Sequence, residues 1–194
     1  LSCELLAEKL ARGEIIALKG LGGYHLMCQV SQVARLRQKR HRPQRPLVLM
    51  LPNLAAAQEW VELDEAMSRF LESPRRPILV APARRPPGSL APGQKTLGVM
   101  LPYTPAHHLL CREALIVTSA NLPGQPICIS AEPVLEKLAD TVVHHDRVIA
   151  VACDDSVYQW GPRGPVPLRR SRGVVPDAVP LHPALTGPAV LALG

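Results

Sequence analysis

The chain has 194 residues and a mass of 21.1 kDa, enough for one full-sized domain and too short for two ordinary ones. Hydrophobic residues make up 47% and charged residues 20%, which excludes a disordered chain. No apolar run approaches the roughly 18 residues of a membrane span, and no signal peptide precedes the first helix, so we expect a soluble, cytoplasmic protein without membrane contact. The net charge of +6 fits a nucleic acid, an anionic small molecule or simply a well-solvated surface.

Apolar periodicity divides the first half of the chain into alternating helices and strands. Ser2 can cap the first helix and Gly13 can end it, while Pro43 and Pro46 follow the second helix. In chain order, the pattern predicts a helix over residues 2–12, a strand over 15–18, a glycine-rich turn over 20–26, a basic helix over 31–42, a strand over 46–51, helical residues over 53–71 and a strand over 76–82.

The second half begins with a loop rich in proline and glycine over residues 83–94, which excludes regular structure there and often covers a site. The following pattern predicts a strand over 96–105, a short helix over 107–112, a strand over 114–121, a helix over 130–138, and strands over 141–151, 155–160 and 166–173. Strands that alternate with helices predict an α/β fold, and the short spacings late in the chain predict a mixed sheet.

The two ends of the chain point to a longer polypeptide. The chain begins with Leu1 instead of Met, so we expect a piece cut from a larger protein. We expect one domain over residues 1–175 and an extended, proline-rich tail over 176–194. The last residues, 190–194, look like the first strand of a further domain.

Three clusters carry the residue types that bind anions. The glycine turn after Lys19 can present backbone N–H groups to an anion, although it can equally be structural. Six cations crowd into residues 35–45, where guanidinium groups suit a phosphate, a nucleic-acid backbone or a solvated helix face. The third cluster, residues 118–121, follows the best-defined strand, at the edge where open α/β sheets bind ligands; Asn121 can alternatively cap the turn.

Weaker signals come from the remaining polar residues. Asp155 can hold Mg²⁺ together with substrate phosphates, or serve as a partner for an arginine. Arg170 and Arg172 fall on one side of the last predicted strand if it is regular, where they can stabilise a polyphosphate. The five cysteines form no CxxC pair, which predicts free, mostly buried thiols.

The order of these segments resembles the YrdC-like domain of HypF-type carbamoyltransferases, maturation factors for [NiFe] hydrogenases. The segments that carry the resemblance are ALKGLGGYHL, RQKRHRPQRPLVLML, GVMLPYTPAHHLL, LIVTSANLPGQPI, CDDSV and LRRSRGVVPDAV. The resemblance implies an open, twisted α/β sheet with a concave basic face that binds ATP, with Mg²⁺ as the expected companion. It also implies formation of carbamoyl-adenylate from carbamate, which carbamoyl phosphate supplies, and transfer of the carbamoyl group by a following domain to the C-terminal cysteine of a HypE-type partner.

Site residues follow from the resemblance position by position. The basic motif that holds the phosphates and the acyl group corresponds to Lys39, Arg42 and Arg45, with arginine at 45 where lysine is expected. The nucleotide-contacting turn corresponds to Thr118, Ser119 and Asn121, and the late phosphate-binding arginines to Arg170 and Arg172. The turn beside the substrate corresponds to Lys19, Tyr24 and His25.

Two other functions remain open. Related threonylcarbamoyl-adenylate synthases share this fold, but they carry a PTET-type segment where this chain has KGLGGYH, which argues against that activity. A double-stranded-RNA-binding module would use the same concave basic face, since proteins contact RNA duplexes largely through shape and backbone charge.

Overall fold

The computed structural model describes residues 2–179, 187, 188 and 191. The strands are β1 (Ile16–Lys19), β2 (Tyr24–Gln29), β3 (Val48–Met50), β4 (Ile78–Pro82), β5 (Thr96–Met100), β6 (Leu115–Ser119), β7 (Thr141–Val143), β8 (Val157–Gly161) and β9 (Gly164–Arg169). The helices are α1 (Cys3–Ala11), α2 (Val33–Arg40), α3 (Leu54–Trp60), α4 (Glu65–Glu72), α5 (Pro105–Leu110) and α6 (Pro133–Leu138).

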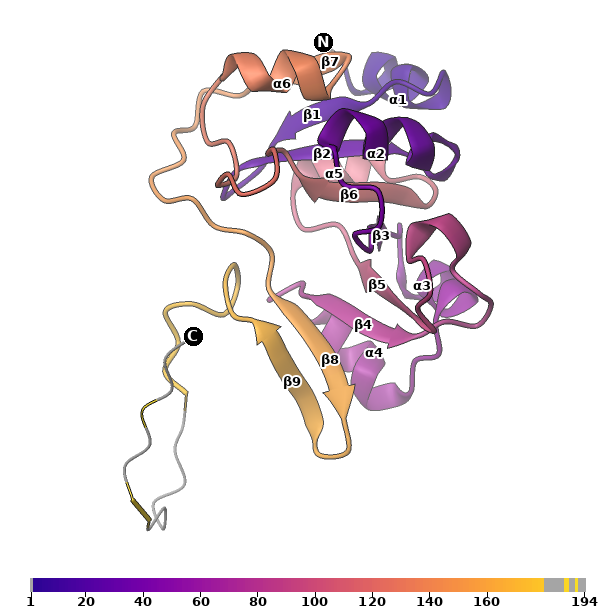
Figure 1. Cartoon of the computed structure of the whole chain (residues 1–194), viewed down its shortest axis with the longest axis vertical. Helices are drawn as coiled ribbons and strands as arrows, with labels where there is room; N and C mark the ends of the chain where they lie inside the picture. The colour runs from indigo at the N-terminus through magenta and orange to yellow at the C-terminus, as the bar shows by residue number, and fades with distance from the viewer. Residues whose placement is uncertain (1, 180–186, 189–190, 192–194) are drawn as a thin grey trace.

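All nine strands form one open sheet in the order β7-β1-β2-β6-β3-β5-β4-β8-β9 (Figure 1). The pairs β1–β7, β3–β5 and β4–β8 are parallel, and the other neighbours are antiparallel. The predicted α/β fold with an open, mixed sheet is therefore confirmed. In Figure 1 the β8–β9 hairpin lies at the end of the sheet opposite β7.

The sheet buries side chains on both faces because successive residues of a strand point in opposite directions. On β3, Leu49 joins a large core with α2, α3, α4 and α6, whereas Met50 joins a smaller core with α1 and α5. The smaller core includes Leu6 and Leu10 of α1 and Leu110 of α5. The two sets of helices thus cover opposite faces of the sheet.

Several predicted boundaries are wrong. β2 runs through residues 24–29, which the sequence analysis assigned in part to the glycine turn and otherwise left unassigned. The predicted strand over 141–151 ends at Val143, and the last strand ends at Arg169, so residues 170–173 lie beyond it. The loop over 83–94 contains a 3₁₀ turn, Gly88–Leu90.

The basic helix is also shorter than predicted. It is preceded by a 3₁₀ turn, Val30–Gln32, and it ends at Arg40 because His41 adopts φ 51°, in the left-handed region, ahead of the prolines. The helical stretch over 53–71 is two helices, α3 and α4, each capped by a side chain, Asn53 and Asp64. The strand expected at 190–194 lies, except for Leu191, outside the described residues. In the described part of the chain, no helix is long and apolar enough to cross a membrane.

Candidate functional site

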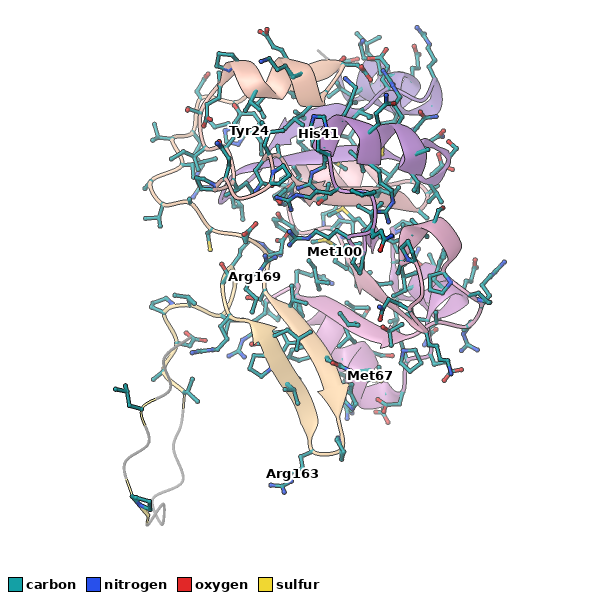
Figure 2. The ribbon with its side chains drawn as sticks, viewed as in Figure 1. Tyr24, His41, Met67, Met100, Arg163 and Arg169 are labelled. Atoms are coloured by element: carbon teal, nitrogen blue, oxygen red, sulfur yellow. The ribbon has the colours of Figure 1, made fainter. Side chains whose placement is uncertain are left out.

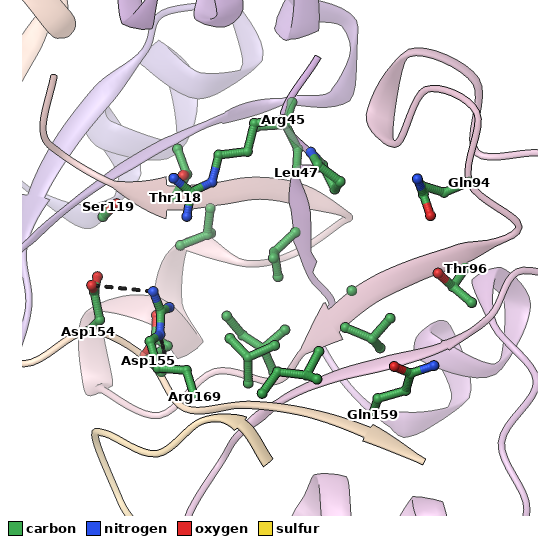
Figure 3. Close-up of a pocket in the computed structure, with 18 residues that line it drawn as sticks. Arg45, Leu47, Gln94, Thr96, Thr118, Ser119, Asp154, Asp155, Gln159 and Arg169 are labelled. Atoms are coloured by element: carbon green, nitrogen blue, oxygen red, sulfur yellow. Dashed lines mark hydrogen bonds and ion pairs between the residues drawn. The ribbon is translucent and has the colours of Figure 1, made fainter. Parts of the chain in front are cut away.

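A cavity of about 440 Å³ opens on the same face of the sheet as α1 and α5 (Figure 3). Its volume lies within the roughly 300–1,000 Å³ typical of small-molecule sites. The floor consists of small apolar side chains and one glycine from five neighbouring strands: Val117 of β6, Val48 of β3, Gly98 of β5, Val80 of β4 and Val157 of β8. The sheet therefore provides a flat apolar surface inside a polar rim.

The rim has a charged side and an uncharged side. Arg45, Ser119, Asp154 and Arg169 lie on one side of the view in Figure 3. Gln94, Thr96 and Gln159 lie on the other side. A ligand that combines an anionic group with an uncharged polar ring matches this division.

Arg45 follows α2 on a segment that Arg37 holds in place. The guanidinium of Arg37 donates to the carbonyl oxygens of Arg42 at 3.1 Å and Arg45 at 2.9 Å. The side chain of Arg42 donates to the carbonyl oxygen of Leu122 at 3.0 Å. Burial and then the charge of Arg45 lower the pKa of Arg42. The two cations therefore sit close enough to repel one another, and an anion between them relieves that repulsion.

Arg40 is the functional-site residue that the sequence analysis missed. Its side chain is almost fully buried, and it donates to the Thr118 hydroxyl at 2.6 Å and to Asn121 Oδ1 at 2.9 Å. Burial and then the charges of Arg42 and Arg45 lower its pKa to about 10. Arg40 thus fixes the turn that carries Thr118, Ser119 and Asn121.

The predicted turn residues meet at the cavity in different ways. Thr118 and Ser119 both line it. Asn121 does not; its Oδ1 accepts from the Ser119 hydroxyl at 2.8 Å and its amide donates to the carbonyl oxygen of Gln125. Asn121 therefore stabilises the turn by hydrogen bonds within it. This role is close to the alternative prediction that Asn121 caps the turn.

The late arginines are arranged differently from the prediction because the strand ends before them. Arg169 lines the cavity and pairs with Asp154 at 3.3 Å, whereas Arg170 donates to the carbonyl oxygen of Asp177 at 2.7 Å, away from the cavity. Arg172 pairs with the buried Asp155 at 2.7 Å. The expectation that Arg170 and Arg172 share one side of a strand is wrong.

Four other predicted residues lie outside the cavity lining. Lys39 donates to the carbonyl oxygen of Lys137 and lies 3.5 Å from Asp140, beside α6. Lys19 donates to the carbonyl oxygen of His145 at 2.9 Å, and the Tyr24 hydroxyl lies 2.6 Å from His144 Nδ1. His25 points to the opposite face from Tyr24 and lies 3.3 Å from Asp155. The structure does not bring these residues together, and their roles stay predictions.

The glycine turn serves packing in this structure. Gly22 accepts a hydrogen bond from the Cys153 N–H at 2.9 Å, and a Cβ at position 22 would overlap the Cys153 carbonyl oxygen. A Cβ on Gly23 would overlap the side chain of Ile127. The glycines thus allow close approach of other parts of this chain, which favours the structural alternative over an anion-binding turn.

Comparisons with known proteins place this geometry in a family. Residues 8–171 match the family model described as "Telomere recombination", which joins Sua5, YciO and YrdC proteins. The chain belongs to the Sua5/YciO/YrdC family. Carbamoyltransferase HypF of Rhodobacter capsulatus is 44% identical over 98% of this chain and 27% of that protein. HypF2 of Cupriavidus necator is 40% identical over 96% of this chain and 26% of that protein.

Solved structures agree with this YrdC-type assignment. Full-length HypF in a phosphate- and nucleotide-bound form matches with a TM-score of 0.85 and 32% identity, over 90% of this chain and 30% of that one. P. abyssi Sua5 complexed with L-threonine matches with a TM-score of 0.74 at 20% identity, which shows the fold alone. The predicted resemblance to the YrdC-like domain of HypF-type proteins is confirmed. The chain spans about a quarter of the length of the curated relatives it matches.

The predicted metal ligand of this YrdC-type domain does not fit. Both carboxylate oxygens of Asp155 are engaged, one by Arg172 and the other by His25, and its side chain is buried. The described residues contain no group of three or more His, Cys, Asp or Glu side chains arranged around one point. Asp154 and Asp155 both line the cavity, but Asp154 is the more exposed of the two, and only its Oδ2 contacts Arg169. Where Mg²⁺ is held by one or two carboxylates and nucleotide phosphates, Asp154 would supply the carboxylate and Asp155 would not.

Proposed function

We propose that this domain binds ATP in the cavity and forms carbamoyl-adenylate, as the adenylating part of a carbamoyltransferase. The observation that carries the proposal is the convergence of Arg45, Ser119 and Arg169 on one cavity, although they come from three distant parts of the sequence. A relative with 32% identity was solved with phosphate and nucleotide bound, which supports a nucleotide as the ligand.

The division of the rim orients the nucleotide. The triphosphate lies at the side of Arg45 and Arg169, where guanidinium groups offer pairs of donors to phosphate oxygens. The base lies on the apolar floor around Gly98, with its polar edge toward the amide side chains of Gln94 and Gln159. The hydroxyl of Thr118 accepts from Arg40, so its own proton is available to a phosphate oxygen.

The reaction needs little from acid–base groups. An oxygen of carbamate attacks the α-phosphorus, the bond from that phosphorus to the bridging oxygen of the β-phosphate breaks, and pyrophosphate leaves with the electron pair. The carboxylate is already ionised, so no side chain has to remove a proton. Positioning and charge neutralisation supply the catalysis, and the arginines of the rim provide both. Mg²⁺, where bound at Asp154, would neutralise further phosphate charge.

Carbamoyl phosphate is the expected source of the carbamate, and a HypE-type protein is the expected final acceptor, through parts of a longer polypeptide. Both assignments rest on the HypF relatives, of which this chain spans about a quarter. The isolated domain is therefore expected to perform the adenylation step alone.

Isothermal titration of the chain with ATP tests the proposal. Arg45→Ala and Arg169→Ala should each weaken ATP binding about tenfold or more, since each removes a charge-assisted contact. Arg163→Ala is the matched control, because Arg163 lies at the tip of the β8–β9 hairpin, far from the cavity (Figure 2). Pyrophosphate release from ATP should require ammonium bicarbonate, which supplies carbamate.

Two results would overturn the assignment. One is equal ATP affinity in all four proteins. The other is binding of duplex RNA but not ATP at physiological salt, with a steep salt dependence, which would favour the RNA-binding alternative.

A further inference from the structure

A buried polar cluster lies next to the cavity, and it consists of His25, Tyr103, His107, Asp155 and Arg172. Arg172 Nε donates to Asp155 Oδ1 at 2.7 Å, and His25 Nε2 lies 3.3 Å from Asp155 Oδ2. The Tyr103 hydroxyl lies 3.3 Å from His25 Nδ1. The Arg172 guanidinium lies 3.5 Å from the centre of the Tyr103 ring. These contacts join four of the five residues in one continuous chain of polar groups, and the His107 ring stacks on His25.

The cluster joins parts of the sheet that are far apart in strand order. His25 belongs to β2, whereas Asp155 and Arg172 flank the β8–β9 hairpin. Four strands, β6, β3, β5 and β4, separate β2 from β8. A second link is the hydrogen bond from the Cys153 N–H to the Gly22 carbonyl oxygen at 2.9 Å. The cluster therefore reaches across the face of the sheet on which the cavity lies.

The protonation states fit a fixed chain of donors. Burial raises the pKa of Tyr103 well above its usual value, so its hydroxyl keeps its proton beside His25 Nδ1. Burial would also raise the pKa of Asp155, but the His25 contact and the charge of Arg172 outweigh it and keep the carboxylate ionised. The stacked ring of His107 is neutral, because burial lowers its pKa to about 3.

The cluster connects directly to the charged side of the cavity. The Asp155 carbonyl oxygen accepts from Arg169 Nε at 2.8 Å, and the adjacent Asp154 holds Arg169 Nη1 at 3.3 Å. The position of the Arg169 side chain at the cavity thus depends on the position of residues 154–155. His25 and Arg172 hold that segment through their contacts with the Asp155 carboxylate.

We propose that Asp155, held by His25 and Arg172, is a positioning residue that sets Arg169 and Asp154 on the charged side of the nucleotide cavity, with Arg45 and Ser119. The proposal assigns Arg172 and His25 to supporting the site instead of to direct phosphate or substrate contact. The expected change in ATP affinity rests on the proposed function, whereas the expected change in hydrogen exchange does not.

The test compares Asp155→Asn, which keeps the size of the side chain and removes its charge, with the unsubstituted chain. Glu14→Gln is the matched control, because Glu14 also bonds a cation and a hydroxyl, Lys9 and Thr141, but lies remote from the cavity. Hydrogen exchange of backbone amides in residues 20–25 and 153–157 should become about a hundredfold faster in Asp155→Asn, since breaking a buried pair is costly. Affinity for ATP should fall about tenfold, measured where each variant is fully folded.

Each outcome decides the proposal. Unchanged exchange in Asp155→Asn overturns it, and so does faster exchange with unchanged ATP affinity. If the unsubstituted chain binds no ATP, the proposed function fails, and the exchange result alone supports or overturns the link between the two parts of the sheet. If Asp155→Asn does not fold, Tyr103→Phe replaces it: loss of one hydrogen bond should speed exchange of the same segments about fivefold, and no change would overturn the proposal.

Discussion

The stability of the fold should depend on pH through one buried histidine. His107 of α5 is 0% exposed, and neither of its ring nitrogens has a hydrogen-bond partner within the described part of the chain. Burial, and then the neighbouring His25, lower its pKa from 6.5 to about 3. In the unfolded chain this histidine takes up a proton near pH 6.5. Between the two values the unfolded state binds more protons than the folded state, so the free energy of unfolding must fall as the pH falls.

The size of the effect follows from the two pKa values. Between pH 7 and pH 5, His107 should remove about 2 kcal/mol from the free energy of unfolding, measured by urea denaturation. The lowered pKa of Asp155 places its own contribution below about pH 4, outside this interval. His107→Leu should abolish that loss, whereas His108→Leu, at the exposed neighbouring position, should keep it. A loss of equal size in His107→Leu would refute the reasoning.

Three further outcomes are expected. Arg40→Met removes donors to Thr118 and Asn121, so urea denaturation should show a loss of about 2 kcal/mol, and ATP should bind more weakly. Gly22→Ala forces a Cβ against Cys153 and should cost about 2 kcal/mol, while Gly93→Ala, where a Cβ meets open space, should cost about 1 kcal/mol from its positive φ. A thiol reagent at pH 8 should label Cys3 and Cys153 first. Burial raises the pKa of the other three thiols, to about 12 for Cys28 and Cys111 and to about 11 for Cys128.

Local signals in the sequence were sufficient for most elements. The predicted cap Ser2 accepts from the Leu5 N–H at the start of α1, and β6 lies where an apolar run meets a polar turn. β2 was missed because five of its six residues are buried, on both faces of the sheet, so its sequence shows no alternation of apolar and polar residues. Burial on both faces depends on helices far away in the sequence, which a local pattern does not reveal.

Helical periodicity could have shown that Arg40, and not Lys39, faces the interior of the protein. Val33, Leu36 and Arg40 are spaced three and four residues apart, so they share one face of α2, and all three are buried. Helical spacing alone therefore places Arg40 on the inner face and Lys39 outside it. A cation among apolar helix positions requires acceptors, and the Thr118–Asn121 turn provides them.

The late arginines were harder to place, since their position depends on where a strand ends. The prediction of a strand over 166–173 put Arg170 and Arg172 on one side, but β9 ends at Arg169. The chain then turns, and the bridge between Asp155 and Arg172 replaces regular pairing. The pairing partner Asp155 lies 17 residues earlier, so no pattern within the last segment indicates which arginine faces the cavity.

The charges around the cavity match the proposed anionic ligand. Asp155 neutralises Arg172 and Asp154 neutralises Arg169, whereas Arg45 makes no ion pair within the described residues. Burial and then the charges of Arg42 and Arg45 lower the pKa of Arg40, and burial and then the charge of Arg45 lower the pKa of Arg42. The folded protein therefore holds unrelieved repulsion beside the cavity. A polyphosphate removes that repulsion and gains paired donors, so much of its affinity should come from charge and weaken with salt. A site built in this way suits the proposed displacement at phosphorus by an ionised carboxylate, for which neutralised charge matters and a general base does not.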